Sequence, residues 1–173
     1  LGRHDTPAKS AFYAGGNDHI GDSVVDLNGT FGFAEVRADD VIAYLSPAYG
    51  DVKYAVAVAP GEGNGTTAGD GLTDAVSLGV MYAAGGIKVG VGYEDFADLG
   101  NGTDNSNMNL GGSYTMDNLT LGLQYQAQTA GTTDTTIFAL VAAFKMDSNT
   151  FVASFGNRDV DNNGAATDAD VMN

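Results

Sequence analysis

From residue 36 onward, apolar and polar residues alternate with a period of two, which is typical of β-strands with two unlike faces. In the segment 107–116, Met108, Leu110 and Tyr114 alternate with small polar residues. In the segment 119–126, leucines and a tyrosine alternate with threonine, glycine and glutamine. We expect eight strands, at residues 36–46, 51–60, 73–83, 86–96, 107–116, 118–128, 135–146 and 149–158.

The connections between these strands alternate in length. Short turns are expected at residues 47–50, 84–86, 117–118 and 147–149, and longer polar loops at 61–72, 97–106, 129–134 and 159–173. This arrangement predicts a single all-β domain over residues 1–173, an up-and-down antiparallel meander whose two rims differ. The residues before 36 lack the period-two pattern, and connecting segments of that length are usually functional.

The apolar residues do not form a membrane-spanning helix. The longest apolar run, residues 138–144, is far shorter than the roughly 20 residues that such a helix needs. Tyrosines and phenylalanines instead gather near the ends of the predicted strands, as they do in transmembrane β-barrels. The polar faces are mostly uncharged and carry Lys53, Lys88 and Lys145 as single cations. Such a face suits a water-filled interior, so the pattern favours a barrel with its apolar side toward lipid.

Composition removes several classes of function. The 173 residues include 7 Lys and Arg against 22 Asp and Glu, a net charge of -15, so we expect no nucleic-acid partner. The sequence has no cysteine, which excludes disulfides, zinc-thiolate sites and thiol nucleophiles. His4 and His19 are too little evidence for a metal centre, and no nucleophile or phosphate-loop motif is present, so we expect no enzyme. The start at Leu1 shows no signal-peptide pattern.

Residues 1–62 carry a family resemblance. The run Gly2-Arg-His-Asp-Thr-Pro7 is followed by an acidic loop that contains glycine, then by Glu35-Val-Arg-Ala-Asp-Asp-Val-Ile-Ala-Tyr-Leu-Ser-Pro47 and Val56-Ala-Val-Ala-Pro-Gly-Glu62. These segments resemble the general-diffusion porins of Gram-negative outer membranes, and residues 63–173 match in pattern, as hairpins with variable loops. The resemblance implies a sixteen-stranded transmembrane antiparallel β-barrel of the outer membrane, usually a homotrimer, of which this chain covers about the middle half.

The resemblance also implies a division of the chain. Residues 4–35 correspond to a long loop that folds inward and narrows the pore, residues 36–158 to strands and hairpins, and residues 159–173 to a long external loop. The implied function is passive diffusion of small hydrophilic solutes and ions across the outer membrane, with membrane lipid as a further partner and no required cofactor. The net charge of -15, with most acids in loops, predicts a mild preference for cations.

The constriction residues follow from the same resemblance. Asp18 and Asp22 correspond to its acidic side, Arg37 to its basic side, and Arg3 to a second cation. Opposite charges across a narrow gap filled with water create a transverse field that favours dipolar solutes aligned with it. Two alternatives remain open. The aspartates can belong to an ordinary solvated turn, and Arg37 can form a salt bridge with Glu35 or Asp39.

A second class of function rests on the last acidic string. Oxygen donors at calcium-loop spacing occur at Asp159, Asp161, Asn163, Thr167 and Asp170, with glycine at the sixth position. The last position is Asp in place of the bidentate Glu, and a strand is expected before it instead of a helix. The alternative is therefore a soluble or secreted calcium-binding β-structural module, such as an adhesin repeat. Extraction separates the two, because a channel needs detergent and a secreted module does not.

Overall fold

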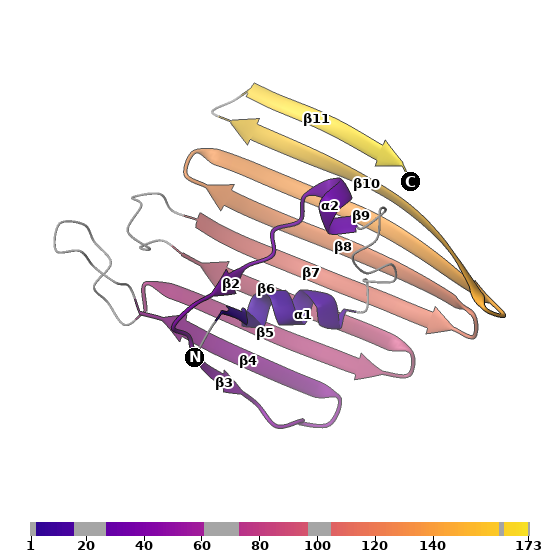
Figure 1. The fold of residues 1–173 in the computed structure, drawn as a ribbon, viewed down its shortest axis with the longest axis horizontal. Coiled ribbons are helices and arrows are strands. Elements are labelled where there is room, and N and C mark those ends of the chain that lie inside the picture. Colours follow the sequence, from indigo (N-terminus) through magenta and orange to yellow (C-terminus); the bar gives the residue numbers. More distant parts are fainter. Residues whose placement is uncertain (1–2, 16–26, 61–72, 97–104, 163–164, 173) are drawn as a thin grey trace.

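The chain folds around one large antiparallel sheet. The computed structural model describes residues 3–15, 27–60, 73–96, 105–162 and 165–172, with side chains up to residue 162. Nine strands pair in strict sequence order, β3-β4-β5-β6-β7-β8-β9-β10-β11, and every neighbouring pair is antiparallel (Figure 1). The predicted antiparallel meander is confirmed. Strands β3 and β11 lie at the two edges of this sheet.

The strand bounds are close to the predicted ranges, but the longer loop expected at 129–134 was wrong: β8 and β9 extend into it and leave a two-residue turn. The bounds are β3 Ile42–Leu45, β4 Val52–Ala59, β5 Ala75–Ala84, β6 Ile87–Asp95, β7 Asn105–Met116, β8 Leu119–Ala130, β9 Thr133–Met146, β10 Asn149–Asn162 and β11 Ala165–Met172. The predicted short turns after β7 and β9 are two-residue turns that begin with Asp117 and Asp147, whose φ angles are 48° and 53°. Positive φ in such turns matches the right-handed twist of the flanking strands.

Two predictions at the ends of the meander were wrong. The long external loop expected at 159–173 is largely a hairpin, because β10 continues to Asn162 and pairs with β11 from Asn162↔Ala165 onward. The strand was missed because Ala, Thr and Asp fill it as far as Asp170, so no large apolar residue repeats on one of its faces. The strand expected at 36–46 is interrupted at Asp40, whose φ of 54° ends one short strand before β3 begins.

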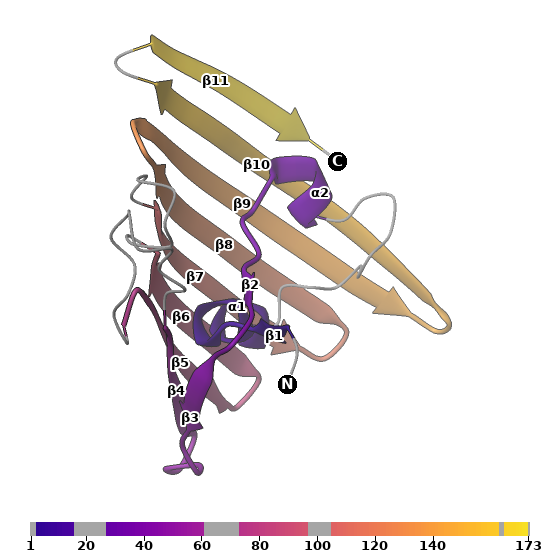
Figure 2. The same cartoon turned by 60° about the vertical axis from the view of Figure 1, so that its left-hand side comes forward.

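A second group of elements precedes the sheet in sequence. It comprises β1 His4–Asp5, α1 Pro7–Ala14, α2 Leu27–Phe31 and β2 Arg37–Ala38, and β1 pairs with β2 in a separate two-stranded sheet. Both helices lie on the same face of the large sheet, as Figure 2 shows. We call this the inner face and the opposite one the outer face. Neither helix, nor any other part of the chain that the structure describes, is long and apolar enough to cross a membrane as a helix.

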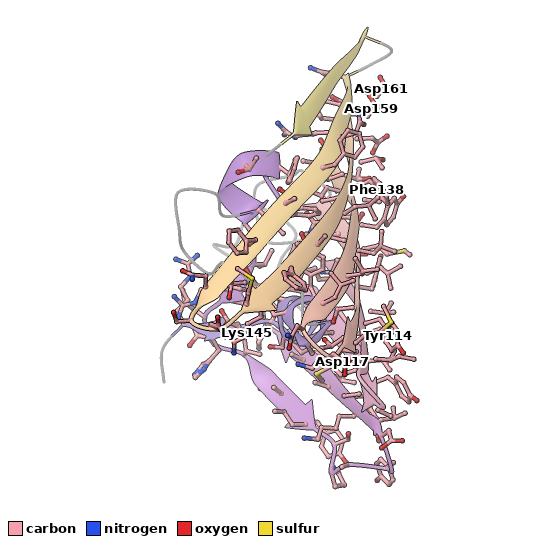
Figure 3. All side chains as sticks on the ribbon, turned by 90° about the vertical axis from the view of Figure 1, so that its right-hand side faces the viewer. Tyr114, Asp117, Phe138, Lys145, Asp159 and Asp161 are labelled. Carbon is pink, nitrogen blue, oxygen red and sulfur yellow. The ribbon has the colours of Figure 1, made fainter. Side chains whose placement is uncertain are left out.

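The two faces of the sheet differ sharply in chemistry. Large apolar side chains project from the outer face, and those of Leu78, Val91, Leu121 and Leu140 are 41–46% exposed. Figure 3 shows Tyr114 and Phe138 on this face, pointing away from the helices. The inner face carries small and polar side chains at the alternate positions, many of them buried under the helices. The outer face has no covering layer among the described residues, so this is one sheet with a single packed side.

Candidate functional site

The most distinctive feature of the molecule is the segment that lies on the inner face, formed by residues 3–15 and 27–38. We call it the inner segment. Its two ends meet, because β1 and β2 pair through His4↔Ala38 and Asp5↔Arg37 and the Thr6 amide donates to the Val36 carbonyl at 3.3 Å. Between its ends the segment places α1 over β5 and β6, and α2 near β10 (Figure 1). The two ends of the inner segment therefore lie side by side, and the chain continues from β2 into β3, at one edge of the large sheet.

Helix α1 rests directly on the backbone of the sheet. Its buried residues Pro7, Ala8, Ala11 and Phe12 face the strands. A Cβ atom at Gly79 would overlap the Pro7 carbonyl oxygen, and one at Gly90 would overlap the Ala11 carbonyl oxygen. Glycine at these positions is therefore required by the close approach of the helix. Sequence reasoning did not single out these two glycines. The signal it missed is that glycines lie opposite one another on paired strands, Gly79 beside Gly92 and Gly90 beside Gly111.

The return half of the inner segment packs through aromatic rings. Phe12, Phe31 and Phe33 form a cluster with Ile137, Ala139 and Val141 of β9. The ring centroids of Phe12 and Phe33 lie 5.4 Å apart, and those of Phe31 and Phe33 lie 6.3 Å apart. Burial of these rings is the main apolar contact between the segment and the sheet. It explains why β9 carries Ile and Val on an inner face that is otherwise small and polar.

Gln126 of β8 binds the return half as a neighbouring strand would. The Ala34 amide donates to Gln126 Oε1 at 2.6 Å, and Gln126 Nε2 donates to the Ala34 carbonyl at 3.1 Å. Gln126 is fully buried, so the loss of either bond would leave a buried polar group unpaired. Sequence reasoning did not single out this residue, since a glutamine at an inner position of a strand looks like an ordinary lumen-facing side chain.

A cluster of charges joins the start of the inner segment to its end. Lys9 Nζ lies 3.1 Å from Asp5 Oδ1 and 3.0 Å from Glu35 Oε2, and Arg37 Nε lies 3.3 Å from the same Asp5 oxygen. Tyr13 and the Asn28 side-chain amide also donate to Glu35. Four charged side chains therefore tie the two ends of the segment together.

The fold favours the charged forms of both Lys9 and Glu35. Burial acts to lower the pKa of Lys9, but its bonds and charge interactions with Glu35 and Asp5 outweigh burial and raise it. Burial acts to raise the pKa of Glu35, but the bonds donated by Tyr13, Lys9 and Asn28 outweigh it and lower that pKa. Both shifts keep the pair ionised near neutral pH.

The two predicted cations of the constriction lie together at the base of the inner segment. Arg3 Nε donates to the Arg37 carbonyl, and Arg37 Nη2 donates to the Arg3 carbonyl, each at 3.2 Å. Both side chains are exposed. The ion pair of Arg37 is with Asp5, and neither Glu35 nor Asp39 takes that place, because the β1–β2 register puts Asp5 opposite Arg37.

The predicted acidic side cannot be placed beside them. Asp18 and Asp22 lie outside the described residues, so their position opposite Arg37 stays a prediction.

The three predicted lumen cations share the inner face. Lys53 pairs in register with Met81, Lys88 with Ser113 and Lys145 with Thr150, and all three lysines are exposed near the short turns. Within the described ranges none of them has a carboxylate oxygen within 4.0 Å; the ion pairs there involve Lys9 and Arg37. Lys53 also lines an open cavity of about 380 Å³ beside the last residue of α1.

The acidic string of the last hairpin does not form a loop. Asp159 and Asp161 belong to β10, and Thr167 and Asp170 belong to β11, where Asp170 pairs in register with Asn157. Figure 3 shows Asp159 on the outer face, beyond Phe138. Asn163 lies outside the described residues. Among the described side chains no three His, Asp or Glu gather as metal ligands, and calcium binding by this string stays a prediction.

Comparison with known proteins gives one result that covers the whole chain. A family model for the Gram-negative porins matches residues 1–173, and so includes both the inner segment and all nine strands of the large sheet. No curated protein matches the sequence.

Proposed function

Because the chain belongs to the Gram-negative porins, which are non-enzymatic diffusion channels of the outer membrane, we propose that it passes small hydrophilic solutes and ions along its inner face. The family match confirms the resemblance found in residues 1–62. It also argues against the alternative of a secreted calcium-binding module, since a protein of this family resides in the outer membrane.

One observation carries the proposal. The outer face presents large, exposed apolar side chains on every strand from β3 to β10, including Ile42, Tyr54, Leu78 and Phe155. Water-exposed apolar patches of soluble monomers rarely exceed a few hundred Å², and an apolar sheet face of this extent is instead suited to lipid. The opposite face, with amides, hydroxyls and lysines, is suited to water.

A closed barrel follows from the physics of the bilayer. The unpaired backbone groups of edge strands β3 and β11 would each cost several kcal/mol in hydrocarbon. We therefore propose that both edges pair with further strands, so that the inner face encloses a lumen. The inner segment then lies inside that lumen and narrows it, as residues 4–35 do in the predicted division of the chain.

The charges of the inner segment support a transverse field at this constriction. Its base brings Arg3 and Arg37 together as the basic side. Asp18 and Asp22 supply the acidic side in this proposal. A solute with a strong dipole aligns with such a field, whereas a large apolar solute gains nothing from it.

Ion preference combines two opposing contributions. The net charge of -15 favours cations throughout the pore and its mouths. Lys53, Lys88 and Lys145 on the inner face oppose it locally. We propose a mild cation preference as the sum. We also propose a homotrimer in outer-membrane lipid; a band of three times the monomer mass in unheated detergent samples tests the trimer.

Reconstitution tests the channel itself. The full-length protein is purified in detergent and added to a planar bilayer, and discrete conductance steps are expected. Vesicles that contain it should swell in small sugars and amino acids but not in large polysaccharides. A protein that stays in solution without detergent and gives neither steps nor swelling would contradict the proposal.

A further inference from the structure

Among the described strands β3 to β10, Glu94 is the one acidic residue on the inner face. On strands β3 to β10, register places Asp95, Asp134, Asp159 and Asp161 on the outer face and Glu94 on the inner face. The Glu94 side chain is fully buried, with an exposed fraction of 0%. Burial of a carboxylate is costly unless hydrogen bonds hold it, so its partners indicate what it does.

The partners of Glu94 connect it to the first turn of α1. Thr6 Oγ1 donates to Glu94 Oε2 at 2.7 Å, and Ser77 Oγ donates to the same oxygen at 3.4 Å. Thr6 Oγ1 in turn accepts the Lys9 amide at 3.2 Å, and Ser77 Oγ accepts the Ala8 amide at 3.0 Å. On the other side, Asn107 Nδ2 donates to Glu94 Oε1 at 2.9 Å.

These bonds supply hydrogen-bond acceptors for the free amides in the first turn of α1. Thr6 is the N-cap, and Pro7, the first helical residue, has no amide hydrogen. The amides of Ala8 and Lys9 lack partners within the helix and are bound by two hydroxyls that both donate to Glu94. A carboxylate here is also favoured by the positive end of the helix dipole. An isolated helix of eight residues is marginal in water, so α1 depends on this support.

We propose that Glu94 is a positioning residue of the pore: it fixes the starting end of α1 against the wall and thereby sets the cross-section left open to solutes. This rests on the proposed channel function. The glycines at 79 and 90 and the Phe12 cluster hold the middle and the return half of the inner segment, and Gln126 holds Ala34. The bonds to Glu94 hold the first turn.

Conductance of single channels tests this role. Glu94→Ala removes the acceptor of both hydroxyls, and the population with α1 detached at this end rises about tenfold or more. Larger conductance steps and greater open-channel current noise are expected. Glu94→Gln should stay close to the native steps, because the unpartnered Asn107 Oδ1 can turn to accept from the new amide. Asp95→Ala, one residue away on the outer face, is the matched control and leaves the steps unchanged.

A reversible tether separates positioning from general damage. The native chain has no cysteine, so Ala8→Cys and Ser77→Cys can be combined with Glu94→Ala, at the place where the Ala8 amide lies 3.0 Å from Ser77 Oγ. The oxidised protein should recover native step size and noise, and reduction of the same sample should abolish the recovery. Thr6→Val removes the hydroxyl that links the Lys9 amide to Glu94 and leaves every strand unchanged. It should also increase step size and noise, and it keeps the proposal testable if Glu94→Ala fails to insert.

The outcomes are distinct. If the native protein gives no conductance steps, the channel function fails and the role of Glu94 falls with it. If the native protein conducts while Glu94→Ala and Thr6→Val both show native steps and noise, the positioning role is overturned. It is also overturned if the oxidised tether leaves the noise of Glu94→Ala unchanged.

Discussion

Asp5 and Arg37 face each other across the two-residue ladder at the base of the inner segment, with Arg37 Nε 3.3 Å from Asp5 Oδ1. They are 32 positions apart in the chain, and the same Asp5 oxygen also contacts Lys9. The two ends of the inner segment are therefore joined by an ion pair between its own residues, separate from its contacts with the large sheet. An exposed pair of this kind stabilises little alone, but a network that shares Lys9 and Glu35 resists opening.

The first prediction concerns acid pH and Glu35. The pKa of Glu35 is lowered in the fold, so its stabilising contribution is present above the ordinary value of about 4.3 and is lost as pH falls through the lower folded value. The pKa of Lys9 is raised, so the lysine keeps its charge at every pH below about 10.4. Open-channel noise should stay flat between about pH 5 and 9 and increase below about pH 4.

Glu35→Gln is the control for this prediction. It removes the titrating group, so its noise at pH 7 should already exceed that of the native protein, with a weaker rise in acid. If Glu35→Gln and the native protein give the same noise at every pH, the cluster does not hold the segment.

The second prediction concerns the close approach of α1 to β6. Gly90→Ala places a methyl group where the Ala11 carbonyl lies, so the helix must shift away from the wall, at a cost of about 1–3 kcal/mol. Single-channel conductance should change and the unfolding temperature should fall. Gly112→Ala on the outer face is the matched control, because a Cβ there meets only the Lys88 carbonyl at 3.9 Å. If the two variants show the same conductance and the same unfolding temperature, the close packing of α1 against Gly90 is contradicted.

The strands could be predicted from the sequence because each buries or exposes one consistent face, and the alternation of Leu121, Leu123 and Tyr125 is unbroken. Strand β11 was not predicted because small and acidic residues fill most of it, and no large apolar residue repeats on one of its faces. The inner segment was located, but its attachments were not, since hydrogen bonds such as those of Gln126 and Glu94 link residues about 90 positions apart. No local pattern encodes such pairs, and they emerge only when the register of the whole sheet is known.

The third prediction tests the lipid-facing side. Leu140 lies on the outer face, 46% exposed, in register with Leu123 and Phe155. Leu140→Arg should make folding into lipid vesicles less favourable by about 2–4 kcal/mol, because arginine is costly near the bilayer centre. Thr120→Lys on the inner face is the control and should fold like the native protein. An unchanged folding free energy for Leu140→Arg would mean that the outer face does not contact lipid.

The fourth prediction concerns the lysines of the inner face. Lys53, Lys88 and Lys145 are exposed, and no carboxylate oxygen of the described residues lies within 4.0 Å of them. Replacing all three by glutamate changes the fixed charge of the proposed lumen by six units without adding volume to the packed side of the sheet. Because fixed charge concentrates counter-ions, the reversal potential in a salt gradient should move strongly toward the cation value.

High salt provides the internal check on this fourth prediction, since screening shortens the Debye length to about 3 Å at 1 M and should shrink the shift. Asp159→Asn on the outer face is the charge control and should leave the reversal potential near its native value. If the triple variant and the native protein share one reversal potential at low salt, these lysines do not line the path of the ions. The inner face would then be the wrong side of the sheet for the lumen, and the proposed route of the solutes would have to be abandoned.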